Sequence, residues 1–169
     1  MKIALLIVDM QKSLLNDVVD QRKIDSACEY INHVAGRLRS NRQTVIHVQD
    51  VEGAEELPSG SLDFIPQINV EPGDIHIAKT YSNAFWNTDL DNVLKANDIG
   101  FVIISGFAAE QCVLFTYNGA LERGYKAAIL QRGFLSTQND AVDATYRDRQ
   151  IVSYSVIDFM LQQNRREQQ

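Results

Sequence analysis

The sequence predicts a three-layer α/β protein, in which an open parallel sheet carries helices on both faces. Two observations indicate this fold: short apolar segments alternate with helical patterns, and several apolar segments are continuous rather than alternating in polarity. Strands covered on both faces have such continuous runs, and strands that alternate with helices form parallel sheets with right-handed crossovers. No repeat or low-complexity segment interrupts the 169 residues, so we expect one domain spanning 1–169.

Six short segments, several of them continuous apolar runs, are predicted to be strands. They are residues 2–9, 44–49, 74–78, 100–106, 126–131 and 150–155. The first of them ends at Asp9, and no small-residue cleavage site follows it. We therefore expect a buried strand there rather than a signal peptide.

The first predicted helix covers residues 24–38, where apolar side chains recur at intervals of three and four residues. Cys28 falls on this apolar stripe, and a free cysteine is often buried as a small hydrophobic residue. We therefore interpret Cys28 as part of the core.

Four more helices are expected after the central strands. In residues 88–98, Thr88 is followed three residues later by Asp91, a pattern similar to a capping box. Another helix follows Cys112 and is predicted to end at Gly124. The remaining two helices are residues 139–149 and 156–164.

The longest irregular segment, residues 50–73, contains all three prolines of the chain. Loops of this length without secondary structure are usually functional or mobile. Two interpretations are equally open: a pocket wall or lid, and a surface insertion.

Charge and cysteine content limit the partners and the location. The formal net charge is -6, and Lys and Arg cluster only near the C-terminus, which argues against a nucleic-acid partner. No apolar stretch reaches the roughly 20 residues that cross a bilayer, so no membrane partner is expected. With only Cys28 and Cys112, the chain fits a reducing compartment, and we expect a cytoplasmic protein.

Three reactive side chains follow predicted strands. Asp9 ends the first strand, Lys79 follows the third, and Cys112 lies shortly after the fourth. Ligands of open parallel sheets bind beyond the carboxyl ends of the strands, so Asp9 and Cys112 would face each other if the first and fourth strands are neighbours. Lys79 is the natural partner for the partly desolvated Asp9 carboxylate. The positive end of the following helix would favour a Cys112 thiolate. Taken singly, each residue also fits a structural role.

Other chemistries with a strand-end cysteine or aspartate do not fit. A cysteine phosphatase loop needs Arg six positions after the cysteine, where Asn118 stands, and a phosphotransferase needs a second carboxylate two positions after Asp9, where Gln11 stands. No glycine-rich dinucleotide or P-loop motif occurs, and we expect no cofactor.

Three segments resemble the isochorismatase-like cysteine hydrolases, a family that includes nicotinamidases and other small-amide hydrolases. They are LLIVDMQ, IAKTYSNAFWNTDL and ISGFAAEQCVLFTYNGALERGY. The resemblance runs nearly end to end and implies a Rossmann-like sheet in the order 3-2-1-4-5-6. It also implies that Asp9, Lys79 and Cys112 are a catalytic triad.

The same resemblance implies a cis peptide bond between Phe107 and Ala108, with the backbone N–H groups of Ala108 and Cys112 forming an oxyanion hole. Asp9 would accept the thiol proton, the sulfur would attack an amide carbonyl, and water would hydrolyse the thioester. Lys79 would orient Asp9. The family also implies a homodimer or homotetramer.

The sequence departs from the metal-binding pattern of nicotinamidases, which resembles D-x-H-x-x-x-x-H after the second strand. Here Asp50 follows His47, and the next histidine is His76. We therefore expect no metal, and nicotinamide is a poor substrate prediction. Two further departures, Ala109 and the pair Gln131–Arg132, concern substrate identity more than the triad.

The side chains considered for a substrate pocket are Gln11, Tyr81, Phe85 and Trp86. Aromatic residues near the start of a helix are also common in cores, so both roles stay open. The leading hypothesis is a metal-independent hydrolase that cleaves a small amide-type C–N bond of a small-molecule substrate. The alternatives are a vinyl-ether hydrolase, which needs no cysteine nucleophile, and a non-catalytic binding or scaffold protein.

Overall fold

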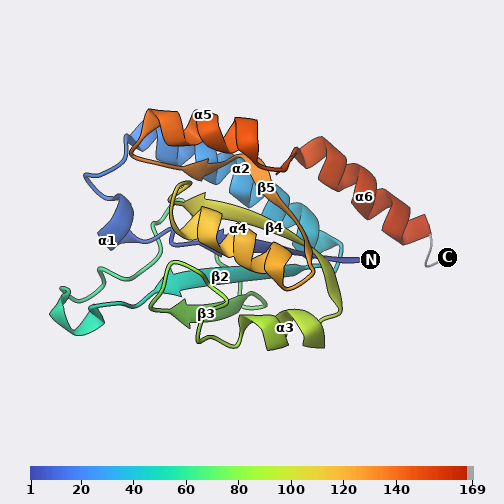
Figure 1. The fold of residues 1–169 in the computed structure, drawn as a ribbon, viewed down its shortest axis with the longest axis horizontal. Helices are drawn as coiled ribbons and strands as arrows, with labels where there is room; N and C mark the ends of the chain where they lie inside the picture. The colour runs from blue at the N-terminus through green and yellow to red at the C-terminus, as the bar shows by residue number, and fades with distance from the viewer. Residues whose placement is uncertain (167–169) are drawn as a thin grey trace.

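The computed structural model describes residues 1–166 and consists of a central parallel sheet with helices on both faces (Figure 1). All six strands are parallel, and their order is β3-β2-β1-β4-β5-β6, which confirms the order implied by the resemblance. The strands are β1 Lys2–Val8, β2 Thr44–Asp50, β3 Ile75–Lys79, β4 Ile99–Phe107, β5 Lys126–Leu135 and β6 Ile151–Val152.

The helices lie on the two faces of the sheet (Figure 1). Helix α2 covers one face, where α6 packs beside it, while α3 and α4 cover the other face. The helices are α1 Lys12–Leu15, α2 Gln21–Ser40, α3 Leu90–Ala96, α4 Cys112–Glu122, α5 Asn139–Asp148 and α6 Tyr154–Arg166, with a short 3-10 helix at Ala54–Glu56.

Two apolar cores fill the spaces between the sheet and its helices. Strand β1 contributes to both: Ile3, Leu5 and Ile7 face the α2 side, and the alternate residues face the α4 side. All six residues from Ile3 to Val8 have no exposed surface. A continuous apolar run is therefore what a central strand needs, because both of its faces are buried.

Helix α2 follows the apolar stripe expected from the sequence. Asp20 caps its N-terminus by accepting a hydrogen bond from the Arg22 N–H. Cys28 lies on the buried face and is 2% exposed. It has the core position that the sequence predicts.

Some ends of the elements differ from the sequence prediction. The N-cap of α3 is Asp89, without a side-chain cap bond, so the capping box expected at Thr88 is wrong. Thr88 instead donates to the Ala84 carbonyl and accepts the Leu90 N–H. Helix α4 does end as predicted, with Gly124 in the left-handed region just beyond it.

The irregular segment 50–73 is held against the end of β1 over part of its length. The N–H groups of Lys12 and Ser13 donate to carbonyls of Asp63 and Ser61, and Ile65 donates to the Met10 carbonyl. Ile65 is 2% exposed in the core. Residues 61–68 thus form a fixed wall beside the carboxyl edge of β1, whereas residues 52–60 are exposed.

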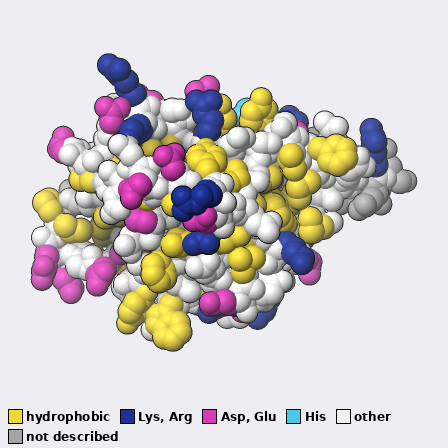
Figure 2. Space-filling view, turned by 45° about the horizontal axis from the view of Figure 1, so that its top comes forward, with side chains coloured by type: hydrophobic (Ala, Val, Ile, Leu, Met, Phe, Trp, Pro, Cys, Tyr) yellow, Lys and Arg dark blue, Asp and Glu magenta, His cyan; other side chains and the backbone are white. Residues whose placement is uncertain are grey.

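The surface carries charges of both signs. On the face shown in Figure 2, basic and acidic side chains are interspersed, with smaller groups of hydrophobic side chains between them. No helix in residues 1–166 is long and apolar enough to span a membrane.

Candidate active site

Asp9 lies directly after β1, which pairs with β2 and β4, at the carboxyl edge of the sheet. Its side chain is 1% exposed, its φ is +55°, and its N–H donates to the Val48 carbonyl at 2.9 Å. A non-glycine residue with positive φ is uncommon, and such geometry occurs at functional sites. The turn aims the carboxylate across the ends of the neighbouring strands.

Lys79 ends β3 and brings its ammonium group to the same point. Its side chain has no exposed surface, and Nζ lies 2.9 Å from Asp9 Oδ2 and 2.6 Å from Asp50 Oδ2. Asp50 and Lys79 are direct neighbours in the pairing of β2 with β3. Two carboxylates therefore share one buried ammonium.

Cys112 is the first residue of α4, and its sulfur completes the cluster. Lys79 Nζ lies 3.5 Å from Cys112 Sγ. One ligand-type atom from each of Asp9, Asp50 and Cys112 lies within 4.8 Å of the others. The structure thus brings together all three residues that the sequence analysis singled out as reactive.

Asp50 is a member of this cluster that the sequence analysis considered only in connection with a metal. Gln11 fixes its backbone: Nε2 donates to the Asp50 carbonyl at 2.9 Å, and Oε1 accepts the Asp50 N–H at 2.7 Å. Gln11 has no exposed surface, so its amide holds Asp50 in place. One signal in the sequence could have identified Asp50 as a member of the cluster: it lies at the end of β2, beside the strand that ends at Lys79.

Burial and charge set the protonation states. Burial raises the pKa of Asp9 to about 6, although Lys79 and the Cys112 hydrogen bond act in the opposite direction. Burial, together with the negative charge of Asp9, raises the pKa of the Cys112 thiol to about 12. For Lys79, burial lowers the pKa, but Asp9, Cys112 and Asp50 together outweigh burial, and the pKa lies above its usual range.

The resting state near neutral pH is therefore a carboxylate, an ammonium and a neutral thiol. This differs from the expectation that the start of α4 favours a thiolate. Burial of the sulfur and the negative charge of Asp9 both raise the pKa of the Cys112 thiol. Together they outweigh the helix dipole, which would lower this pKa but contributes only about 0.3–1 kcal/mol at an exposed site. A base must therefore take the proton as the sulfur reacts.

The backbone between β4 and α4 presents two N–H groups beside Cys112. The peptide bond between Phe107 and Ala108 is cis, at the position that the resemblance implied. In residues 1–166, the N–H groups of Ala108 and Cys112 donate to no protein acceptor, whereas the Ala109 N–H donates to the Leu135 carbonyl at 2.8 Å. The first two groups are available to a ligand.

The aromatic residues considered for the pocket lie in different environments. Tyr81 and Trp86 are 51% and 55% exposed. Phe85 is 4% exposed, and its ring stacks on Tyr125 with centroids 6.1 Å apart, while the Arg123 guanidinium lies over its face. Phe85 is thus a core residue on the α4 side, and the two exposed aromatic residues could contact a ligand.

The donors do not fit a resident metal ion. Asp9, Asp50 and Cys112 form the single group of three or more metal-type ligands found in the described part of the chain. The Lys79 ammonium already lies within 3.5 Å of all three side chains and supplies the positive charge of the cluster. His47 is engaged elsewhere, because its Nε2 lies 3.0 Å from Asp74.

The parallel sheet and the cluster at its switch point define the class of protein: an α/β protein that holds a carboxylate, an ammonium and a cysteine thiol together at the carboxyl edge of its sheet. Comparison with known sequences gives the family. A family model described as the isochorismatase domain matches residues 3–155. The chain belongs to the isochorismatase family, whose members are hydrolases.

Individual relatives agree with this assignment. The chain is 27% identical over 161 residues to the isochorismatase-family protein YwoC of Bacillus subtilis, covering 86% of this chain and 84% of YwoC. It is 30% identical over 95 residues to the ureidoacrylate amidohydrolase RutB of Variovorax paradoxus, covering 55% of this chain and 38% of RutB.

The fold also matches solved structures. An isochorismatase-like hydrolase from Alkaliphilus metalliredigens superposes with a TM-score of 0.80 at 22% identity. The match covers 96% of this chain and 98% of that one. At this identity the likeness concerns the fold.

Proposed function

We propose that this hydrolase cleaves a small amide-type C–N bond through a cysteine thioester, without a metal ion. The observation that carries the proposal is the contact of Lys79 with both Asp9, at 2.9 Å, and Cys112, at 3.5 Å. These distances join a base, a cation and a nucleophile at one buried point. The amidohydrolase activity named for the relative RutB supports the same bond type.

The reaction begins with proton transfer from the Cys112 thiol to the Asp9 carboxylate as Sγ bonds to the amide carbon. The carbonyl π electrons move to oxygen, and the free N–H groups of Ala108 and Cys112 stabilise that oxyanion. Because the pKa of Asp9 is about 6, its carboxylate is ionised at neutral pH yet can hold the proton.

The intermediate collapses when the C–N bond breaks and Asp9 returns its proton to the leaving nitrogen. The resulting thioester is attacked by water, which gives a proton to Asp9. The C–S bond then breaks, and the departing sulfur takes that proton back. Lys79 keeps Asp9 oriented and balances the negative charge throughout the cycle.

The proposal is tested with a panel of small amides, ureido acids and isochorismate, while intact-mass spectrometry detects an acyl adduct on Cys112. Cys112→Ala should lower amide turnover at least about a thousandfold and abolish the adduct. Cys28→Ala is the matched control, since Cys28 is buried in the core, and this variant should keep both turnover and adduct.

Two results would reject the proposal in favour of the alternatives. Turnover of isochorismate that survives Cys112→Ala but is lost in Asp9→Asn would indicate vinyl-ether hydrolysis without a thioester. No turnover and no adduct with any compound, in protein whose Cys112 alkylates no faster than Cys28, would indicate a binding or scaffold protein.

A further inference from the structure

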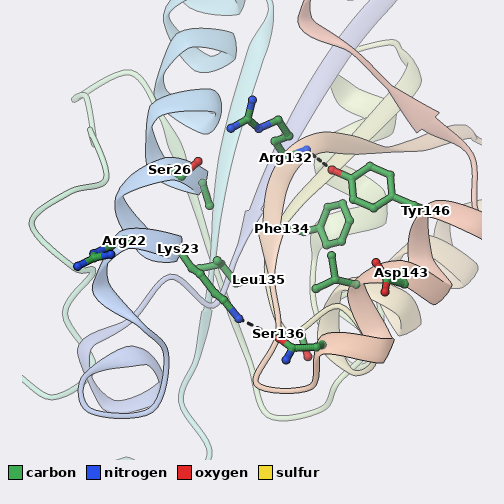
Figure 3. Close-up of a pocket in the computed structure, with 12 residues that line it drawn as sticks. Arg22, Lys23, Ser26, Arg132, Phe134, Leu135, Ser136, Asp143 and Tyr146 are labelled. Carbon is green, nitrogen blue, oxygen red and sulfur yellow. Dashed lines mark hydrogen bonds between the residues drawn. The ribbon is translucent and has the colours of Figure 1, made fainter.

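A cavity separate from the cluster around Cys112 opens between α2, α5 and the end of β5 (Figure 3). Its volume is about 480 Å³, which lies within the range of pockets for small molecules. Asp9, Lys79 and Cys112 do not line it. Its walls come from the start of α2, the end of β5 with the residue that follows it, and α5.

The floor of this cavity is apolar. Phe134 and Leu135 at the end of β5 are 5% and 4% exposed, and Ala27 of α2 is 2% exposed. Figure 3 shows Phe134 between α2 and α5, where its ring faces the space between the two helices. The floor therefore suits the hydrocarbon part of a ligand.

The rim carries a local excess of positive charge in a chain whose formal net charge is -6. Arg22, Lys23 and Arg132 contribute cations, and Asp143 contributes the one carboxylate among the lining residues. In the described residues, none of these three cations forms an ion pair within the protein. Their charge is left for solvent or a ligand.

The Lys23 ammonium is held beside the floor, whereas the side chain of Arg22 turns outward and the Arg132 guanidinium turns toward Tyr30 of α2 (Figure 3). The Lys23 ammonium donates to Asn139 Oδ1 at 3.0 Å, which joins α2 to the first turn of α5. The Arg132 guanidinium donates to Tyr30 Oη at 2.7 Å and lies 4.5 Å above the Tyr30 ring. The Arg132 N–H donates to Tyr146 Oη at 2.9 Å.

We propose that this cavity binds a small organic carboxylate, with its apolar part on Phe134 and Leu135 and its anionic group at the Lys23 ammonium. The combination of a buried apolar floor and unpaired cations on the rim is complementary to such a ligand. This site is independent of the proposed reaction, because it shares no residue with the catalytic cluster.

The test is a titration of isotope-labelled full chain with benzoate, followed by proton–nitrogen correlation spectra. Saturable shifts should appear at the start of α2, the end of β5 and α5, with a dissociation constant on the order of 10 mM for a ligand of this size. Benzyl alcohol, which has the same ring without the charge, should bind more weakly.

Charge variants sharpen the result. Lys23→Gln keeps a group that can bind Asn139 and should weaken benzoate binding about two- to fivefold, as expected for a solvent-exposed ion pair. Asp143→Asn removes the one carboxylate and should strengthen binding by a similar factor. Lys126→Gln, at the other end of β5, is the matched control and should leave binding unchanged.

Ser26→Phe fills the cavity from α2 while it leaves every cation in place, and it should abolish the saturable shifts in protein that keeps its native circular dichroism. The proposal is overturned if benzoate gives no saturable shifts up to about 50 mM. It is also overturned if the shifts centre on Cys112, or if Ser26→Phe instead dissociates a dimer that occupies this surface.

Discussion

Asp9 is a buried carboxylate whose charge depends on a single ammonium that it shares with Asp50. Burial raises its pKa to about 6, so at neutral pH most molecules carry the ionised base. As the pH falls through 6, Asp9 becomes protonated and can no longer accept the proton of Cys112. This titration should be visible in any reaction of the Cys112 sulfur.

The first prediction concerns alkylation of the two cysteines by iodoacetamide. Both thiols have a pKa raised to about 12, mainly by burial, but Cys28 is 2% exposed, whereas Cys112 is half-buried and adjoins Asp9. We expect Cys112 to react faster, with a rate that falls about tenfold per pH unit below pH 6. Peptide mass spectrometry measures both rates, and equal pH-independent rates would contradict the role of Asp9.

The second prediction concerns Asp50→Asn. Asp50 raises the pKa of Asp9 by like-charge repulsion and also binds Lys79 at 2.6 Å. Without the Asp50 charge, the ammonium acts on Asp9 alone, so the pKa of Asp9 should fall. The pH below which the rate of Cys112 alkylation falls should then decrease by about one unit.

The control for that experiment is Glu52→Gln, which removes an exposed carboxylate two residues further along the chain. This variant should leave the pH at which Cys112 alkylation slows unchanged. If this pH is unchanged or higher in Asp50→Asn, Asp50 does not raise the pKa of Asp9.

At the scale of elements, β4 lies directly beside β1, and the cluster of Asp9, Lys79 and Cys112 lies just beyond the ends of these strands. Gly106 has φ +111°, and a Cβ built on it would lie 2.0 Å from the Val8 carbonyl oxygen. No side chain fits there, since the contact is with backbone of the neighbouring strand. Gly106 therefore allows the chain to turn from β4 toward Cys112 while it stays beside β1.

The third prediction is that Gly106→Ala lowers the free energy of unfolding by more than about 3 kcal/mol, because it adds both a clash and a strained φ. Gly36→Ala is the matched control: it lies inside α2, and nothing lies within 4 Å of the added Cβ. This substitution should stabilise the protein by about 0.5–1 kcal/mol. Urea unfolding measures both, and equal effects would contradict the packing argument.

Sequence patterns located these elements well but not their ends. Strand β5 continues past the expected residue 131 to Leu135, with Arg132 at φ +61° and a register shift opposite the end of β4. The polar pair Gln131–Arg132 interrupts the apolar run, so a local pattern predicts a strand end there. Pairing with β4 extends the strand, which only the neighbour in space decides.

At the scale of the whole molecule, a buried ionic network joins α2, β2 and the segment before β3. Arg39 and Asp74 are 2.6 Å apart, and His47 Nε2 lies 3.0 Å from the same Asp74 oxygen. The side chains of Asp74 and His47 are 2% and 0% exposed. Burial alone would raise the pKa of Asp74, but hydrogen bonds from Arg39, the Glu71 N–H and His47 hold it below its ordinary value.

The fourth prediction is that Asp74→Ala lowers the free energy of unfolding by about 3–5 kcal/mol, because it leaves Arg39 and His47 without their shared partner. Since the pKa of Asp74 is lowered in the fold, the wild-type stabilisation is complete above its ordinary value of 3.8 and is lost as the pH falls below it. The difference between wild type and variant should therefore shrink in acid.

Asp158→Ala provides the comparison, since it breaks the pair of Asp158 with Arg37, also on α2, whose side chains are 26% and 42% exposed. An exposed pair should cost less than about 1 kcal/mol. Similar losses in both variants, measured by urea unfolding, would contradict the buried network.

The sequence by itself determined the fold class, the buried run of β1 and the three strand-end residues Asp9, Lys79 and Cys112. Periodicity and apolar runs in a short stretch of sequence indicate which faces of an element are buried, so they can be interpreted without coordinates. The resemblance added the strand order that makes β1 and β4 neighbours.

Only the tertiary structure decided how the ends of the strands meet. Asp50 joined the cluster through its pairing with Lys79 across β2 and β3, and Gln11 acquired its role through bonds to a residue 39 positions away. The structure also decided that Cys112 rests as a neutral thiol. Desolvation and nearby charges depend on groups distant in sequence, so no local pattern records them.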